Sequence, residues 1–312
     1  MEIDRFKLMK DTQYCLFKDI YVKQPTLKEI IDFAPQNGYK AYSEIVTTFT
    51  MTPADIADIL WVEQEILYTT IKSDWEFFIQ RAYMGALDFV ITEIVNGEEI
   101  KTETKIANPI IEKGLNYFFN LTGHYCFTVE TKTLVNEPAP AEEAEGEKDA
   151  SKPNQHREII LLNVDENGLA EEDGFKFTES LYVMLAQYLR AINWEKDVPF
   201  FMQELQSKND SPVHLKNKKL LKALLEAAYQ KRNNKRRPKF NLESMVSALI
   251  CYTGDYKNIW DYPIYMIYDL YHRINKFKSY DETMSIVHSG YYDIKKNPIK
   301  WDEINWASII AL

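Results

Sequence analysis

Glycine is scarce in this chain, with 10 glycines among 312 residues. The phosphate-binding loops of nucleotide-binding α/β folds and the many tight turns of all-β folds both depend on glycine. The composition therefore argues against these two fold classes. Hydrophobic residues make up 46% of the chain and charged residues 27%, and these proportions are ordinary for a globular protein.

Cysteine is also rare. Cys15, Cys126 and Cys251 lie far apart in the sequence and form no CxxC pair. An odd number of cysteines without metal-ligand spacing disfavours a disulfide framework and a structural zinc site, and it predicts a reducing compartment. Cys251 lies within an apolar helical run, so we expect its thiol to be buried and inert.

Long apolar runs are missing. No run approaches the roughly 18 residues that a membrane-spanning helix requires. The first residues, Met1-Glu2-Ile3-Asp4-Arg5, do not have the charged and then apolar layout of a signal peptide. We therefore expect a cytoplasmic protein that has no membrane partner.

Local catalytic motifs are absent. The sequence has no GxxxxGK[ST], GxGxxG, GxSxG or HExxH pattern. Asn163-x-Asp165-x-Asn167-Gly168 resembles the first half of a calcium-binding loop, but Gly174 occupies position 12, where a bidentate acid is required. We interpret these residues as a tight turn. We predict no catalytic residues, no metal and no cofactor, and we expect the dispersed histidines to be solvated or hydrogen bonded: His124, His156, His214, His272 and His288.

The charge is unevenly distributed. The formal net charge is -10, yet residues 213–240 contain ten lysines and arginines and one acid, Glu226. The basic tract at its end could be a solvated connector, could contact an acidic protein surface, or could bind nucleic acid phosphates. The acidic character of the whole chain favours the connector. The tract comprises Lys231, Arg232, Lys235, Arg236, Arg237 and Lys239.

Helix-start signals are frequent. In a capping box, a hydroxyl and a carboxylate three residues later satisfy exposed backbone N–H groups, and this spacing occurs in Thr26 with Glu29, Ser73 with Glu76, and Ser279 with Glu282. Thr52-Pro53 adds an N-cap before a proline. We predict helices over residues 27–33, 38–49, 53–67, 73–84, 178–192, 198–206, 214–231, 241–252, 262–277 and 280–290.

Period-two alternation predicts a few strands. Tyr125, Phe127 and Val129 alternate with polar residues and indicate a strand over residues 124–135, and a second strand is expected over residues 157–164. A short hairpin is expected at residues 12–22. The segment between the two longer strands is rich in acids, alanine and proline, so we expect it to be disordered. We favour a loop within a strand pair over a domain linker, because a strand lies directly on each side.

These signals combine into an α+β, predominantly α-helical fold. We predict a helical bundle-like body with a small antiparallel β element that carries an acidic disordered loop. The expected organisation is a mainly helical region with a short β-hairpin at 1–122, a β-hairpin with a disordered acidic insertion (136–156) at 123–177, and a C-terminal helical domain at 178–312.

The order of several segments supports a family resemblance. These segments are Ile20-Tyr21-Val22-Lys23-Gln24-Pro25, Ser73-Asp74-Trp75, Gly174-Phe175-Lys176-Phe177, Ile259-Trp260-Asp261-Tyr262-Pro263, and Gly290-Tyr291-Tyr292 followed by Trp301 and Trp306. The chain resembles morphogenesis proteins of tailed bacteriophages that infect Gram-positive hosts, and most of all their tail assembly chaperones. The resemblance implies a protein of the host cytoplasm or the virion that holds a tail component such as the tape measure protein. The family has no catalytic residues to carry over.

We therefore expect a non-enzymatic phage tail assembly protein, either a chaperone or a structural component, that binds another tail protein or itself. The aromatic anchors expected for the partner are Tyr262, Tyr265, Trp301 and Trp306, although each of them could instead fill the core. The alternative is a nucleic-acid-associated protein that uses the basic tract. A pocket converging on His124, His272 or His288 would instead point to an enzyme.

Overall fold

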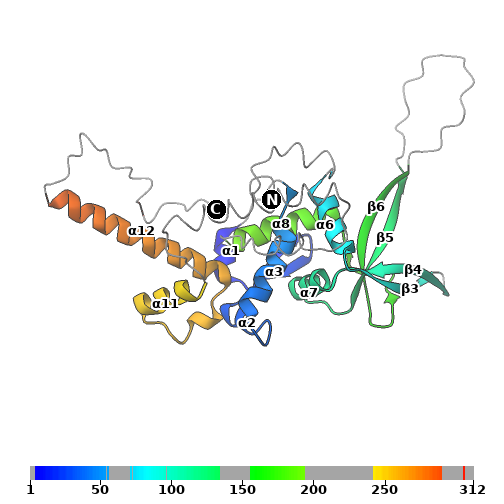
Figure 1. The fold of residues 1–312 in the computed structure, drawn as a ribbon, viewed down its shortest axis with the longest axis horizontal. Helices are drawn as coiled ribbons and strands as arrows, with labels where there is room; N and C mark the ends of the chain where they lie inside the picture. Colours follow the sequence, from blue (N-terminus) through cyan, green and yellow to red (C-terminus); the bar gives the residue numbers. More distant parts are fainter. Residues whose placement is uncertain are drawn as a thin grey trace, which may run out of the picture. The chain divides into compact units, whose positions relative to one another are not determined.

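The computed structural model describes residues 4–53, 55, 71, 73–95, 97–133, 155–193, 242–289 and 305. The chain divides into two compact units (Figure 1), which we call the terminal unit (residues 1–67 and 184–312) and the central unit (residues 68–183). The division falls within helix α8 (Glu179–Ile192).

The terminal unit contains both ends of the chain. Its elements are α1 (Arg5–Lys10), β1 (Gln13–Phe17), β2 (Ile20–Lys23), α2 (Leu27–Ile31), α3 (Gly38–Thr50), the second half of α8, α11 (Leu242–Thr253), the 3₁₀ turn η1 (Ile259–Asp261) and α12 (Ile264–His288). Strands β1 and β2 pair antiparallel, which confirms the predicted hairpin. The Leu27 N–H donates to the Tyr262 carbonyl and the Ile264 N–H donates to the Pro25 carbonyl, each at 3.0 Å. These two bonds tie the start of α2 to the start of α12.

Two of the predicted capping boxes begin helices. The Thr26 hydroxyl accepts the Glu29 N–H at 3.3 Å, and the Glu29 carboxylate accepts the Thr26 N–H at 3.0 Å. Ser73 accepts the Glu76 N–H at 3.1 Å at the start of α6 (Asp74–Tyr83). Both helix starts are therefore confirmed, and each side chain satisfies a backbone donor that the helix leaves unpaired.

The third predicted capping box, at Ser279, does not begin a helix. Helix α12 runs unbroken from Ile264 to His288, so the two helices predicted over 262–277 and 280–290 are one. Within it, the Thr283 hydroxyl donates to the Ser279 carbonyl at 2.7 Å. Hydroxyl side chains can bond the preceding turn inside a helix, so a capping-box spacing does not require the helix to start there.

Several predictions lie outside the described residues. They are the helices over 198–206 and 214–231, most of the helix over 53–67, and the acidic insertion up to residue 154. Among the helices that the structure describes, none is both long enough and apolar enough to cross a membrane.

The central unit is built on a sheet of six strands in the order β7-β3-β4-β5-β6-β8. Its elements are α6, β3 (Leu87–Val95), β4 (Glu98–Ile106), α7 (Pro109–Phe119), β5 (His124–Thr133), β6 (Gln155–Val164), β7 (Leu169–Ala170), β8 (Lys176–Phe177) and the start of α8. Strands β5 and β6 pair antiparallel, with His124 opposite Val164 and Thr133 opposite Gln155. The strand pair predicted on either side of the acidic insertion is therefore confirmed.

The predicted fold class is wrong. The central unit is not a helical bundle with a small antiparallel element, because its six-stranded sheet is mixed: β3 pairs antiparallel with β4 and parallel with β7. Strand β3 was missed because its two faces are both apolar. Phe89 and Ile91 face the sheet's own core, whereas Val90 and Ile94 are exposed on the other face. A strand that is apolar on both faces shows no period-two alternation.

The sheet curls around a small apolar core. Strand β6 lies near one end of the strand order, and β7, which follows it along the chain after a turn, forms the other end. There β7 pairs with β3. The enclosed side chains are Ile91, Cys126, Leu162, Val164 and Ala170, with Phe89 and Ile106 packed against them. Burial raises the pKa of the Cys126 thiol to about 12, so this thiol is protonated at neutral pH.

The turn between β6 and β7 is the one that resembled a calcium-binding loop. The Asp165 carboxylate accepts the Asn167 N–H at 2.9 Å and the Leu169 N–H at 2.7 Å. Gly168 follows with a φ of 80°, a conformation that glycine adopts without strain. The carboxylate therefore serves the backbone of its own turn, which confirms the tight-turn interpretation.

Aromatic side chains pack the helical side of the central unit. Phe177 from β8 is fully buried, and its ring centroid lies 6.0 Å from that of Trp75 and 5.9 Å from that of Phe78. Tyr182 from the start of α8 lies 4.7 Å from Phe78. This cluster packs α6 and the start of α8 against β8, the strand at one end of the sheet.

A partly buried carboxylate joins α7 to β5. Glu112 accepts the Tyr125 N–H at 2.8 Å and lies 3.3 Å from Nδ1 of His124. Burial raises the pKa of Glu112 above its ordinary value, and the contacts with Tyr125 and His124 offset only part of this effect. The folded protein therefore holds a proton at Glu112 more tightly than the unfolded chain does.

This shift predicts a pH dependence of stability. Between the ordinary and the raised pKa the folded state binds more protons, so the contribution of Glu112 to the free energy of unfolding falls as the pH rises through that window. Glu112→Gln should remove this decrease, so the free energy of unfolding of the variant should rise relative to that of the wild type as the pH rises. Urea unfolding between about pH 4 and pH 8 measures this relative rise. The same comparison in a His124→Gln background removes the ionisable neighbour of Glu112. A difference between variant and wild type that does not change with pH would contradict the predicted rise.

Candidate functional site

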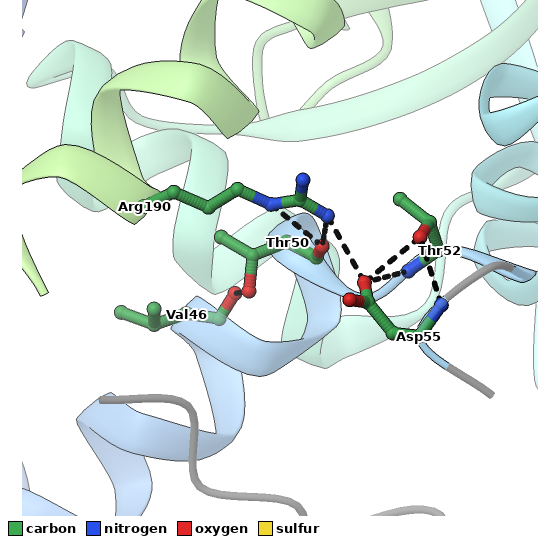
Figure 2. Close-up of polar contacts among 5 residues, drawn as sticks. All are labelled: Val46, Thr50, Thr52, Asp55 and Arg190. Atoms are coloured by element: carbon green, nitrogen blue, oxygen red, sulfur yellow. Dashed lines mark hydrogen bonds and ion pairs between the residues drawn. The ribbon is translucent and has the colours of Figure 1, made fainter. Parts of the chain in front are cut away.

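The Arg190 side chain of α8 forms a group of polar contacts in the terminal unit (Figure 2). We call this group, which comprises Thr50, Thr52, Asp55 and Arg190, the polar corner. The Arg190 guanidinium donates to the carbonyl of Thr50, the last residue of α3, through both Nε (at 3.2 Å) and Nη2. Nη2 also contacts the Asp55 carboxylate at 3.0 Å. A cation suits this position, because a helix C-terminus has unpaired carbonyls and a partial negative charge.

Asp55 and Thr52 cap each other in the same corner. The Asp55 carboxylate accepts the Thr52 N–H at 2.9 Å and the Thr52 hydroxyl at 2.8 Å, while the Asp55 N–H donates to Thr52 Oγ1 at 3.3 Å (Figure 2). These bonds confirm the N-cap predicted at Thr52-Pro53. Arg190 thus pins the end of α3 and the next helix start to α8.

A cavity of about 20 Å³ lies beside this corner, lined by residues of α3, α8 and α12 together with Asn193. The Tyr42 hydroxyl donates to Asn193 Oδ1 at 3.2 Å, and burial raises the pKa of Tyr42 well above its usual range. The volume is that of about one water molecule. The polar corner is therefore part of a closely packed contact between helices.

We expect Arg190→Met to lower the free energy of unfolding of the terminal unit by about 1 kcal/mol. Methionine keeps the apolar stem but leaves the Thr50 carbonyl and the Asp55 carboxylate without this donor. Urea titration measures the loss, with Lys28→Met, at an exposed position on α2, as the control. A loss no larger than that of the control would contradict the proposed pinning.

Exposed aromatic side chains lie at the end of α11 and along its connection to α12, residues 254–263. Tyr252 is 49% exposed, Tyr256 62% and Trp260 37%. The ammonium of Lys278 lies 5.6 Å from the Tyr252 ring, and that of Lys257 lies 5.7 Å from the Tyr256 ring. We call Tyr252, Tyr256 and Trp260 the aromatic triplet.

The connection, which carries Tyr256 and Trp260, is held in shape by its own hydrogen bonds. The indole N–H of Trp260 donates to the Tyr256 carbonyl at 3.0 Å. Asp255 accepts the Tyr262 hydroxyl at 2.6 Å and the Asn258 N–H at 3.0 Å, and these donors lower the pKa of Asp255. A pre-ordered aromatic surface loses little conformational freedom when it binds a partner.

The predicted anchors are placed differently from one another. Tyr265 is fully buried and belongs to the core, whereas Tyr262 is half-buried and bonded to Asp255. Trp301, Trp306 and the basic tract lie outside the described residues. Sequence reasoning missed the triplet, although Gly254-Asp255 and Asn258 signal a turn there, and a turn outside the helical stripe exposes its side chains.

The cysteines and histidines that the structure describes have different surroundings. Cys251 is exposed, so the prediction of a buried thiol is wrong: the residue lies on the solvent side of α11, away from the buried Met245 and Leu249. His124 contacts Glu112, and burial lowers the pKa of His272 on α12. Within the described residues, no group of three or more His, Cys, Asp or Glu side chains is placed to hold a metal ion.

These features define a two-unit protein of helices and a mixed, mainly antiparallel sheet, in which the C-terminal helices and the turn between them present ordered, exposed aromatic side chains. Residues 231–311, about a quarter of the chain, match the family model described as the YomV second domain. The match points to a phage-associated family, that of YomV-like proteins of Bacillus phage. The matched segment contains α11, the aromatic triplet and α12. No curated protein and no solved structure matches the chain.

Proposed function

We propose that this protein is a non-enzymatic phage tail assembly protein, a chaperone or a structural component, that binds another tail protein such as the tape measure protein. The phage-associated match supports the phage context, and the sequence resemblance supports the tail role. The observation that carries the binding role is the aromatic triplet, which is exposed and ordered within the matched segment.

The triplet suits reversible binding of an apolar partner segment. Tyrosine and tryptophan offer large contact areas with few rotatable bonds, and such residues dominate the energetics of protein interfaces. Phe277 and Ile286 add exposed apolar surface farther along α12, at 42% and 53% exposure. In this mechanism a partner helix or extended segment packs its apolar side chains against the triplet, and the nearby lysines contact its polar edge.

We expect Tyr256→Ala to weaken binding of the partner about tenfold or more, because the change removes an exposed anchor. The matched control is Tyr21→Ala, since Tyr21 is similarly exposed (54%) but lies on β2. Calorimetric titration of purified tail proteins, beginning with the tape measure protein, measures both dissociation constants. Equal losses for the two variants would contradict the role of the triplet, and absence of binding by the wild type would contradict the proposed function.

Nucleic acid binding is the second candidate, and the two lysine–tyrosine pairs, Lys257 with Tyr256 and Lys278 with Tyr252, favour it. Aromatic rings beside cations suit single-stranded nucleic acid, whose bases stack and whose phosphates pair with lysine. On this alternative, affinity for a single-stranded oligonucleotide falls steeply with added salt, and charge reversal of Lys235, Arg236 and Arg237 abolishes it. Fluorescence anisotropy measures both effects.

A further inference from the structure

One edge of strand β4 has backbone groups that point away from its own sheet. The Thr92 N–H of β3 donates to Gly168, on the β7 side, at 2.7 Å, so the odd-numbered residues of β3 point toward β4. Their register partners on β4 are even-numbered. The N–H and C=O groups of Glu99, Lys101 and Glu103 therefore point outward, because direction alternates along a strand.

Strand β5 does not cover this edge. Among the described residues, β4 and β5 share a single register pair, Ile106 with Cys126. The Thr104 hydroxyl then donates to the Phe127 carbonyl at 2.6 Å, and beyond this point the β3–β4 and β5–β6 hairpins diverge (Figure 1). Residues 98–103 are all exposed, and Ile100 is 47% exposed in the middle of them.

The charges along the edge alternate in sign, so the possible pairings of two copies differ in which charges they place opposite one another and in the space that they require. A two-fold axis at Lys101 places lysine against lysine and Glu99 against Glu103. An axis at Thr102 also pairs opposite charges, Lys101 with Glu103. It would, however, place Glu99 of the second copy opposite Lys105, where the neighbouring Thr104 already bonds β5. An axis at Ile100 places Glu99 of each copy against Lys101 of the other, and it brings the two Ile100 side chains together. Opposite charges across a strand pair stabilise it and like charges destabilise it.

We infer that β4 is a self-association edge, on which a second copy of this chain pairs antiparallel about a two-fold axis at Ile100. The outward N–H and C=O groups of Glu99 and Lys101 bond those of Lys101 and Glu99 of the second copy. The two Ile100 side chains meet as a non-hydrogen-bonded pair, the closer of the two pair types in an antiparallel ladder. The contact is isologous and therefore closes as a dimer.

Charge reversal within one chain tests this register. Glu99→Lys and Lys101→Glu each place like charges opposite one another twice, and each should weaken dimerisation about tenfold or more. The double variant exchanges the two charges and should restore it. Glu98→Lys is the matched control, because Glu98 faces Thr102 of the second copy. Sedimentation equilibrium into the high-micromolar range measures the constants, and circular dichroism checks the fold. A wild type that stays monomeric, or a double variant that does not recover, would overturn the proposal.

A cysteine at the axis gives an independent readout. In a Cys15→Ser, Cys251→Ser background, Ile100→Cys should form a disulfide-linked dimer on mild oxidation, because residues facing each other across the axis are at disulfide distance. Thr102→Cys, two residues along the same edge, should not, since it faces Glu98. Equal cross-linking of both variants, or cross-linking of neither, would contradict the Ile100 register.

Discussion

Phe177→Ala is expected to lower the free energy of unfolding of the central unit by about 3–5 kcal/mol. Phe177 has no exposed surface, and its ring contacts those of Trp75, Phe78 and Phe119. Truncation removes the transfer free energy of the ring, and it leaves a cavity that these large neighbours fill only in part. The loss should be large because β8 pairs with β6 at only two register positions, so the strand depends on this side chain to stay in place.

Denaturant titration followed by tryptophan fluorescence measures this loss, since Trp75 lies in the same cluster. The control is Val129→Ala on β5, where valine is 56% exposed and the expected change is within about 0.5 kcal/mol. A loss for Phe177→Ala below about 1 kcal/mol would show that the aromatic cluster does not hold the helices to the sheet.

Gly123→Ala is expected to destabilise the central unit by about 3 kcal/mol or more. Gly123 has a φ of 97°, and a Cβ atom there would lie 2.1 Å from the carbonyl oxygen of Val164. Both the backbone conformation and the space therefore exclude a side chain. Relief would require β5 to move away from β6 at the start of their pairing.

The Gly97→Ala variant separates the cost of the backbone conformation from the cost of the steric clash. Gly97 has a similar φ of 85°, but a Cβ atom there would meet nothing within 4 Å. The conformational strain alone should cost this variant about 1 kcal/mol. Thermal unfolding of the two variants gives the comparison. Equal losses would show that strain alone, and not the close approach to Val164, accounts for the effect at Gly123.

Local signals in the sequence predicted the elements whose ends depend on their own residues. Thr26 with Glu29 and Ser73 with Glu76 begin helices, and β5 and β6 pair where alternation predicted strands. Asn108 caps α7 and is followed by Pro109, the same signal that was recognised at Thr52-Pro53. Asn96-Gly97 is a common hairpin dipeptide, and it would have indicated the β3–β4 hairpin. These two elements could therefore have been predicted.

Other features could not be read from local pattern. The parallel pairing of β7 with β3 joins residues far apart in the sequence, and a two-residue strand has no periodicity. The exposure of the aromatic triplet depends on which side chains remain uncovered when α11, η1 and α12 pack together. Tyr265 and Tyr256 are the same residue type a few positions apart, yet one is fully buried and the other is 62% exposed. Only the packing of the terminal unit distinguishes them.

The central claim is that this chain binds another phage tail protein. Affinity purification of the tagged full chain from phage-infected or co-expressing cells, with mass spectrometry of the captured proteins, tests it most directly. We predict that a tail protein, foremost the tape measure protein, co-purifies with the wild type and with Tyr21→Ala, and that Tyr256→Ala loses it. Recovery of no tail protein with the wild-type chain would contradict the claim.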